Sequence, residues 1–143
     1  MLADVVAYSG TSAWYDTAPI LKPAGEVAQT TRDIVLRQGY KISVLGVSDD
    51  GFDTDWVVQM SPHWREGNRT KLEVQIVPGE VRGVIVRVRS IREVNDEAHY
   101  PLAPEKAKWR GASIDEKQIP KISEPALRLH QSVKNKFFGI SSG

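Results

Sequence analysis

Apolar residues recur at helical spacing in two segments, one near each end of the chain. In the first segment, Val27, Ile34 and Val35 fall on one face, and Gly39 follows where a helix C-cap needs a left-handed residue. The pattern therefore predicts a helix over residues 23–38 that is buried along one side.

The second helical pattern lies near the C-terminus. Leu129, Val133 and Phe137 form its apolar stripe, and Ser123 is a residue type that caps helix N-termini. The sequence predicts a helix with Ser123 as its N-cap and Pro125 in its first turn, which ends at Gly139.

Polar and apolar residues alternate in the segments between these helices, and the alternation predicts strands. The segments are residues 40–47, 53–60, 69–77 and 81–94. Strict alternation is typical of antiparallel strands with one covered face and one solvated face. We expect the even-numbered positions of the last three segments to face the helices, among them Trp56, Leu72, Val74 and Val86.

The predicted fold class is α+β: a four-stranded antiparallel sheet with two helices packed on one face, in the order α-β-β-β-β-α. Residues 23–140 form a single domain, and residues 95–121 are a long crossover packed against it. Residues 1–22 show no sustained period and are interpreted as an extended arm or tether. Trp14 and Tyr15 either dock a partner or fold back on the domain, and we favour the second interpretation.

The amino-acid composition excludes several kinds of functional site. The chain has 143 residues, a net charge of +1 and no cysteine, which excludes disulfides, thiolate nucleophiles and zinc sites that use cysteine. A near-neutral chain has no overall field that attracts nucleic acid or an anionic membrane. No stretch has the length of a membrane span and the first residues lack a signal-peptide pattern, so we expect a cytoplasmic protein or a mature segment without its signal.

The sequence contains no motif typical of catalysis or cofactor binding. Its serines lack a nucleophile elbow, and the glycines at Gly79 and Gly83 lie between two strands rather than before a helix. We therefore expect no enzymatic activity and no cofactor.

Two groups of residues resemble metal sites without matching one. The histidines, which lack ligand spacing, are His63, His99 and His130. The acidic residues from Asp49 to Asp55 depart from a calcium loop because the glycine falls too early and position 60 is methionine. We interpret the acidic stretch as a hairpin turn and expect no metal.

Basic residues gather at outward positions of the last two predicted strands. They are Arg69, Lys71, Arg87 and Arg89. This open face could hold phosphates or RNA backbone. However, Glu73 and Glu93 are expected to pair with the arginines across strands. Trp56 is expected to face the helices, so the open face would have no aromatic ring on which a base could stack. We favour a solvated, self-paired face.

One run of short motifs is more specific. Its parts are Arg37-Gln38-Gly39-Tyr40-Lys41-Ile42, then Gly51-Phe52-Asp53-Thr54-Asp55-Trp56, then Gly67-Asn68-Arg69-Thr70-Lys71-Leu72-Glu73-Val74. The run resembles a group of bacterial envelope lipoproteins with a helix-grip domain, similar to BamC-type repeats, over residues 24–92. In that group a helix leads to a glycine-tyrosine strand, a second strand with a Gly…Thr-x-Trp pattern and an arginine-rich third strand.

The resemblance implies a periplasm-facing domain at the outer membrane, tethered by a lipid on an N-terminal cysteine, with residues 1–22 as the tether. The chain departs from the group because it has no cysteine. The resemblance also implies scaffolding or contact with another envelope protein, and no catalysis.

Three functional hypotheses follow. The first is a non-enzymatic, lipoprotein-like envelope module that binds another protein through the open face or through Trp14 and Tyr15. The second is a cytoplasmic domain that binds nucleic acid or another anion through the basic positions of the open face. The third is a small-molecule pocket between the helices and the crossover, lined by Trp56 and Trp109. We favour the first.

Overall fold

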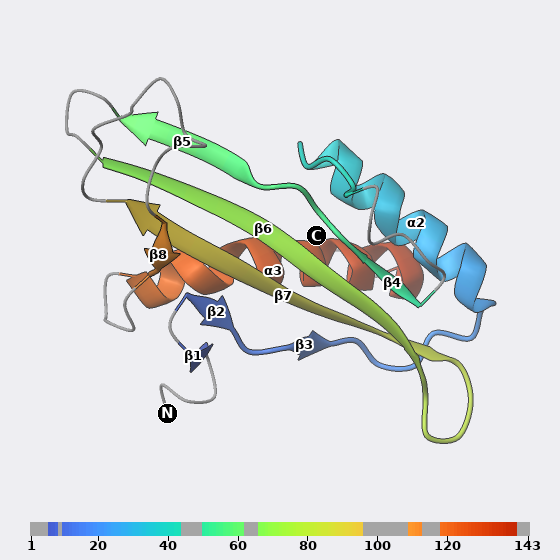
Figure 1. The fold of residues 1–143 in the computed structure, drawn as a ribbon. Coiled ribbons are helices and arrows are strands. Elements are labelled where there is room, and N and C mark those ends of the chain that lie inside the picture. The colour runs from blue at the N-terminus through green and yellow to red at the C-terminus, as the bar shows by residue number, and fades with distance from the viewer. Residues whose placement is uncertain are drawn as a thin grey trace.

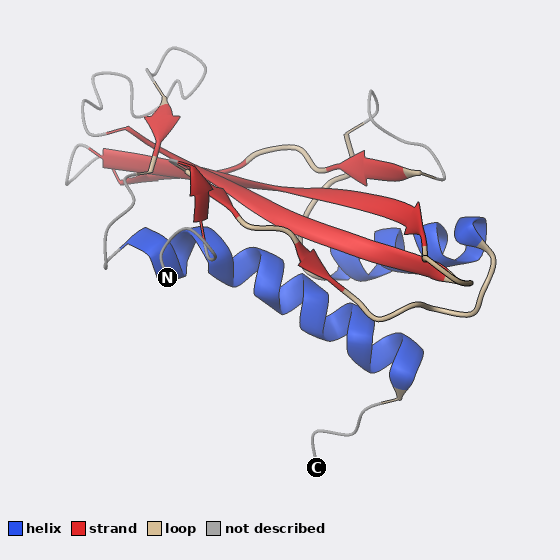
Figure 2. Cartoon of the chain, turned by 90° about the horizontal axis from the view of Figure 1, so that it is seen from below, coloured by secondary structure: helices blue, strands red, loops and turns tan. Residues whose placement is uncertain are grey.

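The computed structural model describes residues 6–8, 10–43, 50–61, 66–95, 109–112 and 118–139. These residues form an antiparallel sheet and two helices, and both helices lie on the same side of the sheet (Figure 1 and Figure 2). The predicted α+β class is therefore confirmed.

The two helices are α2 (Ala24–Arg37) and α3 (Gln118–Phe138). The sheet beside them is built around two long strands. The long strands are β6 (Glu66–Pro78) and β7 (Val84–Asn95), and the strands beside β6 are β4 (Gly51–Asp53) and β5 (Val57–Ser61). The short strands near β7 are β1 (Val6–Tyr8), β2 (Thr11–Ser12), β3 (Tyr15–Asp16) and β8 (Arg110–Gly111). The order is β1-β2-β7-β6-β4; β3 and β8 also pair with β7, and β5 pairs with β6.

The β6–β7 hairpin sets which side chains face the helices. Its register runs without interruption from Gly67 opposite Asn95 to Pro78 opposite Val84. Directly opposite residues of antiparallel strands point to the same face, so the even-numbered positions of both strands share one side. The buried residues on that side include Leu72, Val74, Ile76, Val86 and Val88. The predicted parity is confirmed for these two strands.

The core lies between this side of the sheet and the helices. Its residues from the helices are Val27, Ala28, Ile34, Val35, Ala126, Leu129 and Val133. Phe52 of β4 is also buried there, with 2% of its surface exposed. The helix predicted over residues 23–38 is confirmed, and Gly39 after it has a φ of 96°, as its capping role requires.

α3 differs from its prediction at the N-terminal end. The sequence placed the N-cap at Ser123, but the helix begins at Gln118, and Ser123 is buried within it. Ile122 packs in a small second core with Ala112, next to β8, and this burial stabilises turns that a local capping signal does not predict. Pro125, expected in the first turn, therefore lies inside the helix.

β4 and β5 replace the single predicted second strand, and the break between them changes the side to which Trp56 points. Phe52 lies opposite Val74, whereas Val58 lies opposite Arg69, so one extra residue is accommodated between the two pairings. Such a β-bulge moves every later side chain to the other face. The expectation that Trp56 faces the helices is wrong, because its ring lies beside Arg69 on the opposite side.

The described parts of the predicted arm and crossover both lie against β7. β2, β3 and β8 pair with this strand. Two hydroxyl groups extend the pairing: Ser12 Oγ accepts the backbone N–H of Ser90 at 3.0 Å, and Thr17 Oγ accepts that of Val86 at 3.1 Å. Residues 11–20 are therefore part of the sheet layer.

The first predicted strand is described only at its start. Within residues 40–43, Ile42 forms an antiparallel bridge with Thr54. The backbone N–H of Asp55 donates to the carbonyl oxygen of Lys41 at 2.8 Å. The rest of the range 40–47 lies outside the described residues.

Candidate functional site

The side of the sheet opposite the helices gathers aromatic and charged residues from distant parts of the sequence. Odd-numbered positions of β6 and β7 point to this side because they alternate with the buried positions. We call this surface the open face, and its described members include Trp14, Asp16, Asp53, Trp56, Arg69, Lys71, Glu73, Gln75, Arg87, Arg89, Glu93 and Trp109. Among the described elements, no helix lies on this side (Figure 2).

Arg69 is the centre of the first group on the open face. Its guanidinium carbon lies 4.2 Å from the ring centroid of Trp56 and 4.7 Å from that of Trp109. Its Nε donates to Oε1 of Glu93 on the neighbouring strand at 2.7 Å. Lys71 adds a second cation, 5.0 Å from the Trp56 ring. The cation–π contacts and the carboxylate together restrain a flat guanidinium against two indoles.

Trp14 is the centre of the second group. The guanidinium carbons of Arg89 and Arg87 lie 4.3 and 5.0 Å from its ring centroid. Arg89 donates to Oε1 of Glu73 at 2.5 Å, and Arg87 donates to Oδ1 of Asp16 at 3.0 Å. Each arginine therefore binds an indole with its face and a carboxylate with its N–H groups.

Among the described residues of the open face, positive and negative charges are equal in number. The cations are Arg69, Lys71, Arg87 and Arg89, and the carboxylates are Asp16, Asp53, Glu73 and Glu93. The predicted pairing of Glu73 and Glu93 with arginines across strands is confirmed. Asp53 lies opposite Glu73, and its pKa is raised above the ordinary value by burial and by the charge of Glu73.

Trp14 and Tyr15, neighbours in the sequence, point to opposite sides of the sheet. Tyr15 lies opposite Val88 and packs against the core. Its ring centroid is 6.2 Å from that of His130 on α3. The structure thus unites Trp14 with the arginines of β7 and separates it from Tyr15.

Trp56 and Trp109 are the open-face residues that the sequence assigned elsewhere. They were expected to line a pocket between the helices and the crossover, and the structure instead places both against Arg69 on the other side of the sheet. A signal for Trp56 was available: Trp56, Val57 and Val58 are consecutive apolar residues, so the alternation fails there. Trp109 carries no comparable local signal.

The described residues offer no metal site. No group of three or more His, Cys, Asp or Glu side chains is placed to hold a metal ion within these ranges. His130 lies on α3, with Nε2 2.9 Å from the carbonyl oxygen of Asp16. His63, His99 and Asp49 lie outside the described residues.

The helices of the described part also include none that is both long and apolar enough to cross a membrane. Comparison with known proteins assigns no family, since no protein-family model and no curated protein matches the sequence. The function is therefore inferred from the surfaces themselves.

Proposed function

We propose that the chain is a non-enzymatic interaction domain that binds a folded protein through the open face of its sheet. The observation that carries the proposal is a set of indoles held by arginines that are themselves bound by carboxylates. Tryptophan and arginine are enriched among the residues that contribute most to protein–protein binding. Because these side chains are already restrained in the unbound protein, less side-chain entropy is lost on association.

Charge balance indicates the chemistry of the partner. A surface that carries equal numbers of cations and carboxylates attracts another surface of mixed charge more than it attracts a polyanion. Trp14, Trp56 and Trp109 are each partly exposed and supply apolar contact area. The partner that fits is a protein surface with apolar side chains at its centre and charges of both signs around them.

The resemblance to envelope lipoproteins supports a cell-envelope location for this domain, with any lipid anchor attached outside the present chain. The course of α3 along the antiparallel sheet supports a helix-grip arrangement (Figure 2). Fractionation of cells that express the full-length gene product tests the location. Recovery in the cytosol would contradict it.

Site-specific photo-crosslinking tests the surface. A photoreactive residue replaces Gln75, an exposed position on the open face, and in a matched variant it replaces Gln131, an exposed position on α3. We expect a specific adduct from position 75 and none of the same mass from position 131. Mass spectrometry then identifies the crosslinked protein.

The purified pair provides the quantitative test. Trp14→Ala and Trp56→Ala are each expected to weaken binding by at least about tenfold, because hot-spot truncations cost about 2 kcal/mol or more. Gln131→Ala is the control and should leave the affinity unchanged. Unchanged affinity in both tryptophan variants, or crosslinking from position 131 alone, contradicts the proposal.

Nucleic-acid binding is the second candidate, because the indoles needed for base stacking do lie on the open face. The carboxylates beside them oppose a phosphate backbone. Titration with a fluorescent single-stranded oligonucleotide at low salt separates the candidates. The protein-binding proposal expects no association; affinity that falls steeply with salt and is lost in Arg69→Gln would favour nucleic acid instead.

A further inference from the structure

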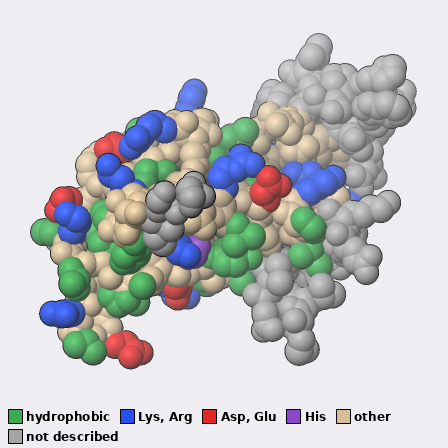
Figure 3. Space-filling view, turned by 180° about the vertical axis from the view of Figure 1, so that it is seen from behind, with side chains coloured by type: hydrophobic (Ala, Val, Ile, Leu, Met, Phe, Trp, Pro, Cys, Tyr) green, Lys and Arg blue, Asp and Glu red, His purple; other side chains and the backbone are tan. Residues whose placement is uncertain are grey.

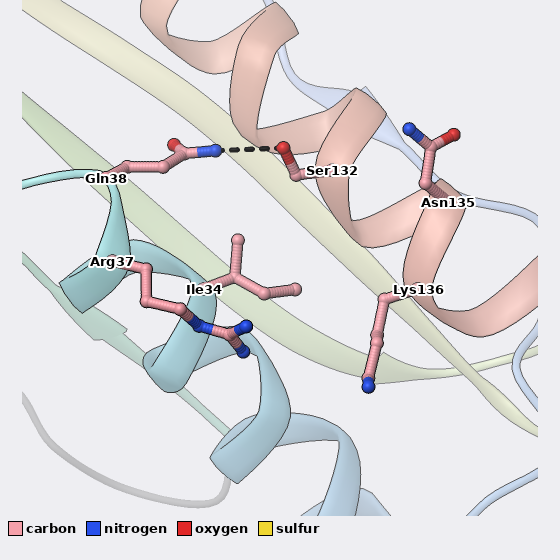
Figure 4. A pocket seen from close by; sticks show the side chains of 6 residues that line it. All are labelled: Ile34, Arg37, Gln38, Ser132, Asn135 and Lys136. Carbon is pink, nitrogen blue, oxygen red and sulfur yellow. Dashed lines mark hydrogen bonds between the residues drawn. The ribbon is translucent and has the colours of Figure 1, made fainter. Parts of the chain in front are cut away.

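Figure 3 shows the face of the molecule opposite to that of Figure 1, where Lys and Arg side chains are scattered among hydrophobic ones. A separate hollow lies between the two helices (Figure 4). It has a volume of about 420 Å³ and is lined by the last turns of α2 and α3 (Figure 4). The lining residues are Ile34, Arg37, Gln38, Ser132, Asn135 and Lys136. Its size is within the usual range for a small-molecule site.

Several polar side chains of this hollow can donate hydrogen bonds. Gln38 Nε2 donates to Ser132 Oγ at 2.9 Å, so the Ser132 hydroxyl keeps its own proton to donate. Gln131 Nε2 donates to Asn135 Oδ1 at 2.8 Å, which engages the amide oxygen and leaves the amide N–H groups of Asn135 as donors. A ligand with several acceptor atoms would therefore find donors in the hollow.

The cations of the hollow lack the partners that cations have on the open face. Arg37 donates through Nε to the backbone oxygen of Asp33 at 3.3 Å. In the part of the chain that the structure describes, no carboxylate lies within salt-bridge distance of Arg37 or Lys136. No carboxylate among the described residues therefore neutralises their charges.

The hollow also has an apolar floor. The side chain of Ile34 points into it from α2, between the two cationic side chains (Figure 4), and only 7% of this residue is exposed. A bound anion would thus lie against a surface from which water is partly excluded, where charge-assisted hydrogen bonds are stronger than in bulk solvent.

We propose that this hollow binds a phosphate group, held by Arg37 and Lys136 and oriented by Ser132 and Asn135. Phosphate supplies the multiple acceptor oxygens and the negative charge that the lining lacks. The group could belong to a soluble phosphate ester or to a lipid headgroup, which share this chemistry. The inference is independent of the protein-binding function proposed for the open face.

Titration of the intact chain with inorganic phosphate, followed by NMR of backbone and side-chain amides, tests the site. The Gln38 and Asn135 side-chain amides and the Ser132 backbone amide should shift with saturation. In the double variant Arg37→Gln, Lys136→Gln the affinity should fall by at least about tenfold, because both charge-assisted hydrogen-bond donors are lost.

The matched control is the double variant Lys41→Gln, Lys121→Gln, which removes the same charge from exposed positions outside the hollow. It should bind phosphate as the unmodified chain does. Equal weakening in both double variants indicates a general charge effect and overturns the proposal. Absence of any phosphate-dependent shift at low salt also overturns it.

A second pair of probes identifies the source of the group. Glycerol 3-phosphate and vesicles of phosphatidylglycerol in phosphatidylcholine are compared with vesicles of phosphatidylcholine alone. Binding of the soluble ester that depends on Arg37 and Lys136 supports a metabolite, and binding confined to the anionic vesicles with the same dependence supports a lipid headgroup. Vesicle binding that survives the double variant contradicts a role for the hollow.

Discussion

The open face and the hollow between the helices both carry arginine and lysine, yet the described cations are bound differently in the two places. On the open face, Arg69, Arg87 and Arg89 are each paired with a carboxylate and packed on an indole. In the hollow, Arg37 and Lys136 have no carboxylate within reach among the described residues. The pairing of the cations, more than their number, determines which surface can accept an anion.

The difference has a structural cause. Antiparallel pairing places arginine and glutamate directly opposite each other, as at Arg69–Glu93 and Arg89–Glu73, so charges on strands tend to be matched locally. Arg37 and Lys136 instead lie in the last turns of α2 and α3, where cations interact with the negative ends of the helix dipoles. Those dipole ends attract the cations without supplying a full countercharge.

The largest loss of stability is expected from a substitution in the core, because both surfaces depend on it. Leu129→Ala removes a fully buried side chain between α3 and the sheet and should lower the free energy of unfolding by about 2–5 kcal/mol. Urea denaturation measures the loss. Leu127→Ala, at a position of the same helix that is 46% exposed, is the control and should change stability by about 0.5 kcal/mol or less.

A change at Gly10 should break the open face while leaving the hollow intact. Gly10 has a φ of 79°, and an added Cβ would lie 2.7 Å from the carbonyl oxygen of Arg92 and 2.7 Å from Cα of Gly111. Gly10→Ala should therefore displace the segments that carry Trp14 and Trp109 and lower the free energy of unfolding by about 1–3 kcal/mol. Tryptophan fluorescence reports the displacement, and urea denaturation measures the loss of stability.

The control for this prediction is Gly39→Ala, at a φ of 96° with no atom within 4 Å of an added Cβ. Gly39→Ala should lower the free energy of unfolding by only about 1 kcal/mol, the cost of a residue with a Cβ at a positive φ. Phosphate binding should persist in Gly10→Ala. A larger loss of stability in Gly39→Ala than in Gly10→Ala would contradict the close approach at Gly10.

Removing one cation from each surface sharpens the comparison. Arg89→Gln leaves Glu73, whose side chain is 20% exposed, without its partner and should lower the free energy of unfolding by about 1 kcal/mol. Arg37→Gln breaks no ion pair in the described structure and should change it by about 0.5 kcal/mol or less. Denaturation of both variants in parallel gives the difference; equal losses would mean that the open-face pairing is not stabilising.

The smallest effect concerns pH. Because the pKa of Asp53 is raised by burial and by Glu73, the folded state holds this proton more tightly than the unfolded chain does. The contribution to stability is present at pH below the ordinary aspartate pKa and is lost as pH rises through the raised value. Asp53→Asn should flatten this decline and be slightly more stable than the native chain at neutral pH, as measured by denaturation across a pH series. A steeper decline in the variant would contradict the assignment.

The spacing of apolar residues in the sequence predicted the helices and strands that keep one regular period. α2, the β6–β7 hairpin and the outward position of the basic residues all follow from the sequence pattern, because each element keeps one period throughout. Cross-strand pairing of Glu73 and Glu93 was also predictable, since the strands are joined by a short turn that fixes their register.

Features that depend on long-range contact were not predictable. The extra N-terminal turns of α3 depend on Ile122 packing with Ala112, a contact between segments that no local propensity encodes. Trp109 reaches Arg69 only because β8 pairs with the end of β7. Short strands of two residues, such as β2 and β8, have too few positions to display a period.

The bulge between β4 and β5 lets one short stretch of chain supply an aromatic ring to each side of the sheet. If the pairing that places Phe52 opposite Val74 continued without the extra residue being accommodated, Trp56 would lie opposite Thr70 and would turn toward the interior. With the bulge, Phe52 stays in the core while Trp56 lies beside Arg69 on the surface. Two residues with even positions, four apart in the sequence, therefore serve stability on one side and recognition on the other.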